Sequence, residues 1–172
     1  YQLIMGKRVV VLLSVMVFML SGCKVKYTLS GQSIPPDAKT VSVGFFANKA
    51  ALAAPAFSQQ LTEELKTKFL RETRLQLVPS GGDLEFEGAV TGYSVSPTAV
   101  QGNETAALNR LTVSVSVTYV NNLKEEDNFT TNFSRFADFS ANTSLTAVES
   151  QLGPVIMEQL IQDIFNRAFI NW

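Results

Sequence analysis

Residues 111–119 constrain the fold most strongly, because apolar and polar side chains alternate there without a break. The apolar positions are Leu111, Val113, Val115, Val117 and Tyr119, and the positions between them are Thr112, Ser114, Ser116 and Thr118. Successive side chains of a β-strand point to opposite faces of its sheet. The alternation therefore predicts a strand from Arg110 to Tyr119, with one buried face and one face of hydroxyl groups.

Four other segments have the composition of strands. They cover residues 40–46, 75–78, 84–94 and 129–139, and they are rich in β-branched and aromatic residues or alternate in polarity. Phe136 breaks the two-residue period of the last segment, which indicates a bulge or the end of that strand. Turn-forming residues separate strands at 79–83 and 121–127. The polar stretch 97–109 predicts a long loop, with either a functional role or simple mobility.

Two segments carry apolar residues at helical spacing. In residues 56–73, which follow Pro55, the apolar stripe contains Phe57, Leu61, Leu65 and Phe69, with Leu70 beside it, and the outward positions are Glu63, Glu64, Lys66, Lys68, Arg71 and Glu72. A second helix is predicted from Thr146 to Ala168, where Thr146 and Glu149 have the spacing of a capping box. The pair Gly153-Pro154 predicts either a kink in this helix or the start of another one at Pro154.

The order of these elements predicts the fold class. A strand, a helix, three to four further strands and a final helix favour an α+β protein with two layers, in which both helices pack on one face of a mixed or antiparallel sheet of four to five strands. The first strand joins the sheet through a helix. We therefore expect a parallel pair beside it, connected by a right-handed crossover.

The N-terminal residues have the pattern of an export signal. Basic Lys7 and Arg8 precede an apolar run at residues 9–20, and small residues follow the run. The run is shorter than the ~20 apolar residues that span a bilayer. The sequence Leu20-Ser21-Gly22-Cys23 resembles the bacterial lipobox, which implies cleavage before Cys23 and attachment of lipid to that cysteine. We expect a signal peptide at 1–22, a lipidated tether at 23–39 and one domain at 40–172.

Lipid at Cys23 would hold the protein at a membrane surface without spanning it. One acyl chain gives only marginal membrane binding, and two or more give stable anchoring. Lys24 stands where an aspartate would indicate retention in the inner membrane, so the enterobacterial sorting rule favours the outer membrane. An ordinary signal peptide, or a core helix with a chance cysteine, is the alternative interpretation.

The composition excludes several classes of chemistry. The chain contains no histidine and a single cysteine, so it cannot form a Ser-His-Asp triad, a Cys-His pair, an imidazole metal site or an internal disulfide. Its net charge is −1, and loss of Lys7 and Arg8 with the signal leaves 12 basic and 15 acidic residues, a net charge of −3. A nucleic-acid-binding protein would show a basic excess. We expect no catalytic residues, no cofactor and no metal.

One acidic cluster leaves a minor alternative open. Asp83, Glu85 and Glu87 lie on one face of the predicted strand at 84–94, and Leu84, Phe86 and Ala89 lie on the other. Such a cluster forms either a solvated strand face, a calcium site or an acid–base pair. A calcium site needs six or more oxygen ligands gathered in three dimensions, so the solvated face is the expected interpretation.

The mature chain resembles the LptE family, in the form found in Bacteroidetes. The stretches that carry the resemblance are Ser33-Ile34-Pro35-Pro36, Thr40-Val41-Ser42-Val43, residues 80–88, Gly92-Tyr93-Ser94-Val95, residues 102–112 and residues 163–169. No single stretch contains a catalytic motif. Their joint order behind a lipobox is what makes the resemblance specific.

The resemblance implies a fold, a partner and a function. LptE proteins are outer-membrane lipoproteins with two helices on a four-stranded sheet. They form a plug inside the large β-barrel LptD, and the two proteins together move lipopolysaccharide from the periplasmic bridge to the outer leaflet. No lipopolysaccharide-contacting basic residue of the enterobacterial relatives is carried over to a position in this chain.

A plug would need a rigid body, a polar exterior and a tether. Cys23 would provide the tether, and the serine- and threonine-rich strand faces with the 97–109 loop would contact the barrel lumen. The candidates for contact with lipid A phosphates are Arg71, Arg74, Arg110 and Arg135, since guanidinium groups bind phosphate bidentately. Solvated charges or internal ion pairs are the alternative for these arginines.

Two other functions are compatible with the sequence. The first is a periplasm-facing lipoprotein that binds apolar cargo, or acts as an envelope chaperone, without a barrel partner. It requires an open apolar cavity between the helices and the sheet, whereas a plug requires a filled core. The second is a carboxylate hydrolase that uses Asp83, Glu85 or Glu87.

Overall fold

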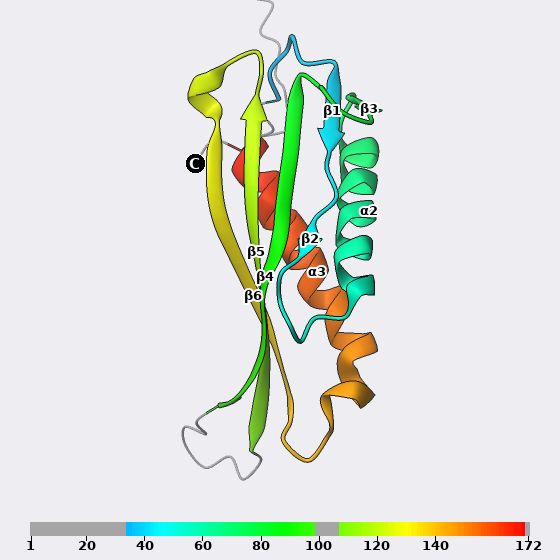
Figure 1. Cartoon of the computed structure of the whole chain (residues 1–172), viewed down its shortest axis with the longest axis vertical. Helices are drawn as coiled ribbons and strands as arrows, with labels where there is room; N and C mark the ends of the chain where they lie inside the picture. The colour runs from blue at the N-terminus through cyan, green and yellow to red at the C-terminus, as the bar shows by residue number, and fades with distance from the viewer. Residues whose placement is uncertain (1–33, 99–106, 171–172) are drawn as a thin grey trace, which may run out of the picture. The chain divides into compact units, whose positions relative to one another are not determined.

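The computed structural model describes residues 34–98 and 107–170 of the chain (Figure 1). The elements are β1 (Thr40–Val43), β2 (Ala47–Asn48), α2 (Pro55–Glu72), β3 (Gln76–Val78), β4 (Leu84–Thr98), β5 (Leu108–Asn121), the short 3-10 helix η1 (Glu125–Asp127), β6 (Phe129–Ser140) and α3 (Leu145–Phe169). The expected signal peptide and Cys23 lie outside the described residues, as do positions 99–106 of the predicted loop. The ends of that loop, at 97–98 and 108–109, belong to strands.

The sheet is mixed and is covered on one face by the two helices, as the sequence predicted (Figure 1). Its order is β3-β1-β4-β5-β6, with β2 beside β4. Strand β1 pairs in parallel with β3 and β4, which confirms a parallel pair around α2. The pairs β4–β5 and β5–β6 are antiparallel. The sheet has six strands rather than four or five, since the predicted first strand at 40–46 is shortened to β1 and a separate short strand, β2, follows it.

The division of the first strand decides which phenylalanine enters the core. Val43 pairs with Phe86 and Ala47 pairs with Ala89, so three residues of the first strand face two residues of β4. The extra residue changes the alternation: Phe46 is fully buried, and Phe45 is 66% exposed. Simple alternation over 40–46 could not predict this bulge.

Strand β4 contains a second irregularity. Its register with β5 shifts between Val90 and Gly92. Before the shift, Leu84 and Phe86 are buried towards the helices, whereas Ala89 pairs with Ser116 and lies on the opposite face. The prediction that Ala89 shares a face with Leu84 and Phe86 was therefore wrong, because Val90 is the next inward residue.

Aromatic side chains fill the space between the helices and the sheet. They are Phe69 of α2, Phe86 of β4, Tyr119 of β5, and Phe165 and Phe169 of α3, all fully or almost fully buried. The ring centroids of Phe69 and Phe86 are 4.6 Å apart, and those of Phe86 and Tyr119 are 4.8 Å apart. Each such pair contributes about 0.5–1.5 kcal/mol beyond the burial of its area. One cluster thus joins both helices to the central strands.

Helix α2 buries the predicted stripe, and two of its residues differ from expectation. Pro55 begins the helix, where its missing N–H costs no hydrogen bond. Leu70 is 55% exposed, because it lies about 100° around the helix from buried Phe69. Lys68 faces α3 rather than solvent: its side chain is 19% exposed, and its Nζ lies 2.6 Å from Oε1 of Gln162.

Helix α3 begins one residue earlier than predicted, and the capping box was wrong. Ser144 is the N-cap residue, and Thr146 lies inside the first turn. Glu149 instead accepts a 2.6 Å hydrogen bond from the hydroxyl of Tyr93 on β4. The helix continues through Pro154, so no second helix starts there.

The two phenylalanines of the bulge provide a direct test of this arrangement. Phe46→Ala should lower the free energy of unfolding by about 3–5 kcal/mol, because it removes a fully buried ring. Phe45→Ala should change it by less than about 0.5 kcal/mol, as expected at an exposed position. Urea denaturation of both variants measures the difference. Similar losses for the two variants would contradict the observed bulge.

Candidate functional site

The face of the sheet opposite the helices is polar, and no helix within the described residues covers it. In Figure 1, α3 passes behind β4, β5 and β6, and no helix lies in front of these strands. We call this surface the polar sheet face. Its exposed or half-buried residues are Glu85 and Glu87 of β4, Thr112, Ser114, Ser116 and Thr118 of β5, and Thr130, Asn132, Ser134 and Asp138 of β6. The alternation of β5 produces this surface, because its valines take the other face.

Hydroxyl groups of neighbouring strands contact one another on the polar sheet face. The Oγ atoms of Ser114 and Ser134 are 3.1 Å apart, and the Oγ1 atoms of Thr118 and Thr130 are also 3.1 Å apart. Both pairs lie directly opposite in the β5–β6 register. Cross-strand hydroxyl pairs of this kind stabilise a sheet. The surface therefore has a defined arrangement while it remains able to hydrogen-bond a partner.

Arg110 lies on this face and is held by two residues of β6. Its Nε and Nη2 donate to the carboxylate of Asp138 at 2.7 and 2.8 Å, and its Cζ lies 3.7 Å from the centroid of the Phe136 ring. The hydrogen bond from Arg110 lowers the pKa of Asp138. Phe136, 49% exposed, is thus accommodated beneath a guanidinium group. Strand β6 neither bulges nor ends there, so both predictions for Phe136 were wrong.

Arg135 lies on β6 next to Phe136, and its side chain points to the face of the sheet that the helices cover. Its Nε and Nη2 donate to the carboxylate of Asp163 on α3 at 2.5 and 2.6 Å. This bidentate ion pair joins the outer strand to the helix that covers it. Two of the four candidate arginines therefore form internal ion pairs, which the sequence analysis left open as an alternative.

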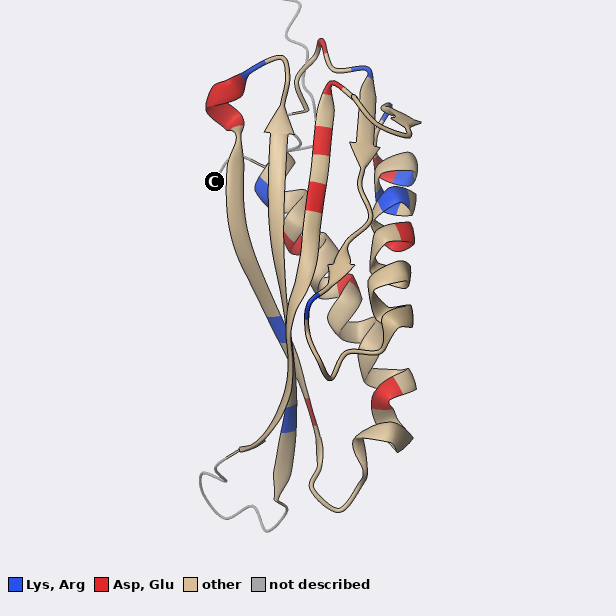
Figure 2. Cartoon of the chain, viewed as in Figure 1, with Lys and Arg blue, Asp and Glu red and all other residues tan. Residues whose placement is uncertain are grey.

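Arg71 and Arg74 differ from the other two candidates. Arg71 lies in the last turn of α2, Arg74 lies between α2 and β3, and both are exposed. Within residues 34–98 and 107–170, neither side chain forms an ion pair. Arg110 and Arg135 lie on opposite faces of the sheet, so the four arginines do not form one cluster. Figure 2 shows basic residues distributed over strands, helices and loops.

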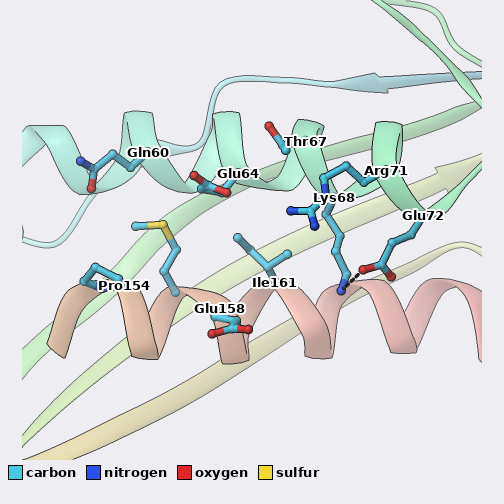
Figure 3. A pocket seen from close by; sticks show the side chains of 10 residues that line it. Gln60, Glu64, Thr67, Lys68, Arg71, Glu72, Pro154, Glu158 and Ile161 are labelled. Atoms are coloured by element: carbon cyan, nitrogen blue, oxygen red, sulfur yellow. Dashed lines mark ion pairs between the residues drawn. The ribbon is translucent and has the colours of Figure 1, made fainter. Parts of the chain in front are cut away.

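A groove of about 530 Å³ lies between α2 and α3 (Figure 3). Its lining consists of Gln60, Glu64, Thr67, Lys68, Arg71 and Glu72 of α2, and Pro154, Met157, Glu158 and Ile161 of α3. Lys68 crosses it and contacts Glu72 at 2.7 Å. The charges are mixed, and the interior behind the groove is filled by the aromatic cluster. This is not the open apolar cavity between helices and sheet that a cargo-binding lipoprotein requires.

Two carboxylates of the acidic cluster, those of Asp83 and Glu85, are engaged in local hydrogen bonds. Oδ2 of Asp83 accepts from the backbone N–H of Lys39 and from both the N–H and the hydroxyl of Thr40, at 2.8–2.9 Å. These bonds, led by that from Lys39, lower the pKa of Asp83. Glu85 accepts a 2.7 Å bond from the side chain of Asn122. Asp83 and Glu85 therefore fasten β1 and the β5–η1 turn to β4 rather than forming a shared catalytic or metal site.

The described part of the chain contains neither a membrane-spanning helix nor a cluster of metal-binding side chains. Neither α2 nor α3 is long and apolar enough to cross a membrane, and no other helix within 34–98 and 107–170 is either. No group of three or more acidic or cysteine side chains in those ranges could hold a metal ion.

A family model described as LptE, lipopolysaccharide-assembly, matches residues 38–168. The matched range begins just before β1 and ends one residue before the end of α3, so it includes the whole sheet and both helices. The chain belongs to the LptE family. This confirms the resemblance inferred from the sequence. Comparison with curated protein sequences finds no match.

Several solved structures have a loosely similar fold. A minor lipoprotein from Acinetobacter baumannii is 16% identical with a TM-score of 0.49, over 76% of this chain and 91% of that one. Uncharacterized lipoprotein B from Nitrosomonas europaea is 14% identical with a TM-score of 0.48, over 82% of this chain and 88% of that one. The family assignment rests on the sequence match and not on these similarities.

The hydrogen bonds of Asp83 predict a pH dependence of stability for this LptE-family domain. Its folded pKa lies below the ordinary value of 3.8, so its contribution is present above that value and is lost as pH falls through the folded pKa. Asp83→Asn should therefore lower the urea midpoint at pH 7 and reduce its decline below pH 4. Glu87→Gln, at an exposed position, is the matched control. Identical pH profiles for Asp83→Asn and the unmodified domain would contradict this role.

Proposed function

We propose that the mature protein is a lipid-anchored outer-membrane component that plugs the lumen of an LptD-type β-barrel and takes part in moving lipopolysaccharide to the outer leaflet. The role is non-enzymatic. The observation that carries the proposal is the uncovered polar sheet face on a fully packed body, in a chain of the LptE family. No cofactor is needed for it.

The physical properties of the domain suit a plug. The lumen of a large membrane barrel is polar, so a body inside it must offer polar side chains and must not deform. The hydroxyl groups of β5 and β6 meet the first requirement along two long strands. The aromatic cluster meets the second, because close-packed interiors have low compressibility. The polar sheet face is therefore the surface we assign to the barrel wall.

The lipid anchor of the proposal is Cys23. Acyl chains on this residue would restrict the domain to the inner surface of the outer membrane, beside the entrance of a barrel. The tether at 23–39 would connect the anchor to β1, which begins at Thr40. Lys24 supports the outer membrane as the destination, by the sorting rule given above.

We assign contact with lipid A phosphates to Arg71 and Arg74. A phosphate at Arg110 or Arg135 would first have to displace Asp138 or Asp163 from a bidentate ion pair. Arg71 and Arg74 carry no such cost within the described structure, and they lie three residues apart in sequence at the C-terminal end of α2. Charge-assisted hydrogen bonds from guanidinium groups are suited to phosphate.

The barrel partnership can be tested by mild detergent extraction of tagged protein from its own outer membrane, followed by identification of bound proteins by mass. The expected result is a large barrel of the LptD type in stoichiometric amount. Cys23→Ala is the matched control, and it should lose membrane anchoring while retaining a folded domain. A monomer with no barrel would refute the plug and would favour the cargo-binding lipoprotein.

Binding of lipopolysaccharide tests the arginine assignment separately. Arg71→Ala with Arg74→Ala should weaken binding by about tenfold or more, the equivalent of ~1.4 kcal/mol, without changing the urea midpoint. Arg135→Ala should instead lower the urea midpoint, because it breaks the ion pair with Asp163, and it should leave the affinity for lipopolysaccharide unchanged. Affinity for immobilised lipopolysaccharide and urea denaturation are the two measurements. Unchanged affinity in the double variant would exclude these arginines as phosphate contacts.

A further inference from the structure

Strand β6 forms one outer edge of the sheet and is unusually long for an edge. It spans 12 residues, pairs only with β5 among the strands of residues 34–98 and 107–170, and shows no register shift along its length. In Figure 1 it runs along the outer side of the sheet, beyond β5. One row of its backbone groups therefore faces away from the sheet.

The pairing identifies which backbone groups those are. The N–H of Ala141 donates to the carbonyl of Ala107 at 2.9 Å, one step beyond the pair Leu108–Ser140. Hydrogen-bonded and non-hydrogen-bonded pairs alternate in an antiparallel ladder, so the odd-numbered residues of β6 bond to β5. The residues that direct N–H and C=O outwards are Thr130, Asn132, Ser134, Phe136 and Asp138. The N–H of Asn122 donates to the carbonyl of Asp83, so the backbone groups of even-numbered β5 residues bond to β4. The odd-numbered residues of β5 are then the ones that bond to β6, in agreement with this assignment.

The two edges of the sheet are protected very differently. Proteins block exposed edges with short strands, prolines, bulges or charges. The opposite edge, β3, has three residues and is followed by Pro79. Strand β6 contains no proline, glycine or bulge, and residues 129–134 carry no charge. Its only charges, Arg135 and Asp138, are neutralised by ion pairs within the domain.

We propose that β6 accepts an extended segment of the barrel partner, which adds a strand to the sheet through main-chain hydrogen bonds. This inference rests on the proposed function, because it names how the partner is held. Outward backbone groups can be satisfied by another extended chain. The added strand would lie next to exposed Thr130 and Asn132 on one face and half-buried Phe129 and Phe133 on the other.

The neighbouring side chains define the chemistry of the added segment. It must be uncharged opposite 129–134, and it must alternate between polar and apolar residues to match the two faces of β6. The membrane-spanning strands of a closed barrel are already paired with one another, so the added segment must come from a loop or a terminal part of the barrel protein. The edge is also continuous with the polar sheet face. One partner can therefore contact both surfaces.

Asn132 provides a test that separates the backbone from the side chain. Its N–H points outwards, so Asn132→Pro removes a donor to the partner and no bond to β5, which an edge strand tolerates. Asn132→Ala keeps the N–H and is the matched control. In detergent extracts, Asn132→Pro should retain at least tenfold less barrel than Asn132→Ala, with both domains folded by circular dichroism. A photo-crosslinking residue at 132 should form an adduct with the barrel.

A second variant decides the matter if Asn132→Pro fails to fold. Asn132→Lys places a charge at the edge and should also reduce barrel capture at least tenfold. Ser116 pairs with Asn132 on the polar sheet face, but its strand, β5, has a neighbouring strand on each side. Ser116→Lys should therefore reduce barrel capture less than Asn132→Lys does. Equal capture by the proline and alanine variants, or an adduct only with a second copy of this chain, would overturn the inference while leaving the plug intact. Absence of any barrel from the unmodified protein would instead remove the proposed function and this inference together.

Discussion

The domain depends on the packing of two helices against a single face of its sheet. Phe69 of α2 and Phe169 of α3 both contact Phe86 of β4, so the aromatic cluster holds three elements at once. With one cysteine the chain cannot close an internal disulfide, and no metal site forms within the described residues. Burial of apolar surface must therefore provide most of the folding free energy. The polar elements of the structure are arranged around that requirement.

Covering one face leaves the other face and one edge for contacts with other molecules. The hydroxyl groups of β5 lie on the polar sheet face because the valines between them occupy the core. The edge of β6 is exposed because the sheet ends there, and Arg135 holds this edge strand to α3 through Asp163. Both surfaces are built on rigid strands rather than on loops. The proposed plug would need surfaces of this kind.

Most of the fold was predictable from the sequence, since its signals are local. The alternation of 111–119 and the stripe from Phe57 to Phe69 each reflect one buried face, and the order of the elements then favours two layers. The predictions that were wrong concern residues whose neighbours are distant in sequence. Phe136 lies on the polar sheet face, where the guanidinium group of Arg110 covers its ring. Glu149 does not cap the start of α3, and its carboxylate instead accepts a hydrogen bond from Tyr93. Nothing in the segments around these residues indicates such partners.

The family, the two-layer architecture and the polar character of one strand face can be inferred from the amino-acid sequence, because short-range periodicity and motif order carry that information. The lipid site at Cys23 remains a sequence prediction of the same local kind. The three-dimensional arrangement is needed to establish which arginines are paired, which phenylalanine of 45–46 is buried, and which strands of the described residues form the edges of the sheet. These depend on register and on contacts between residues about 28 positions apart or more, such as Arg135 with Asp163 and Arg110 with Asp138. A linear pattern does not specify them, since the same side chains could be solvated or paired until the strands and helices are placed.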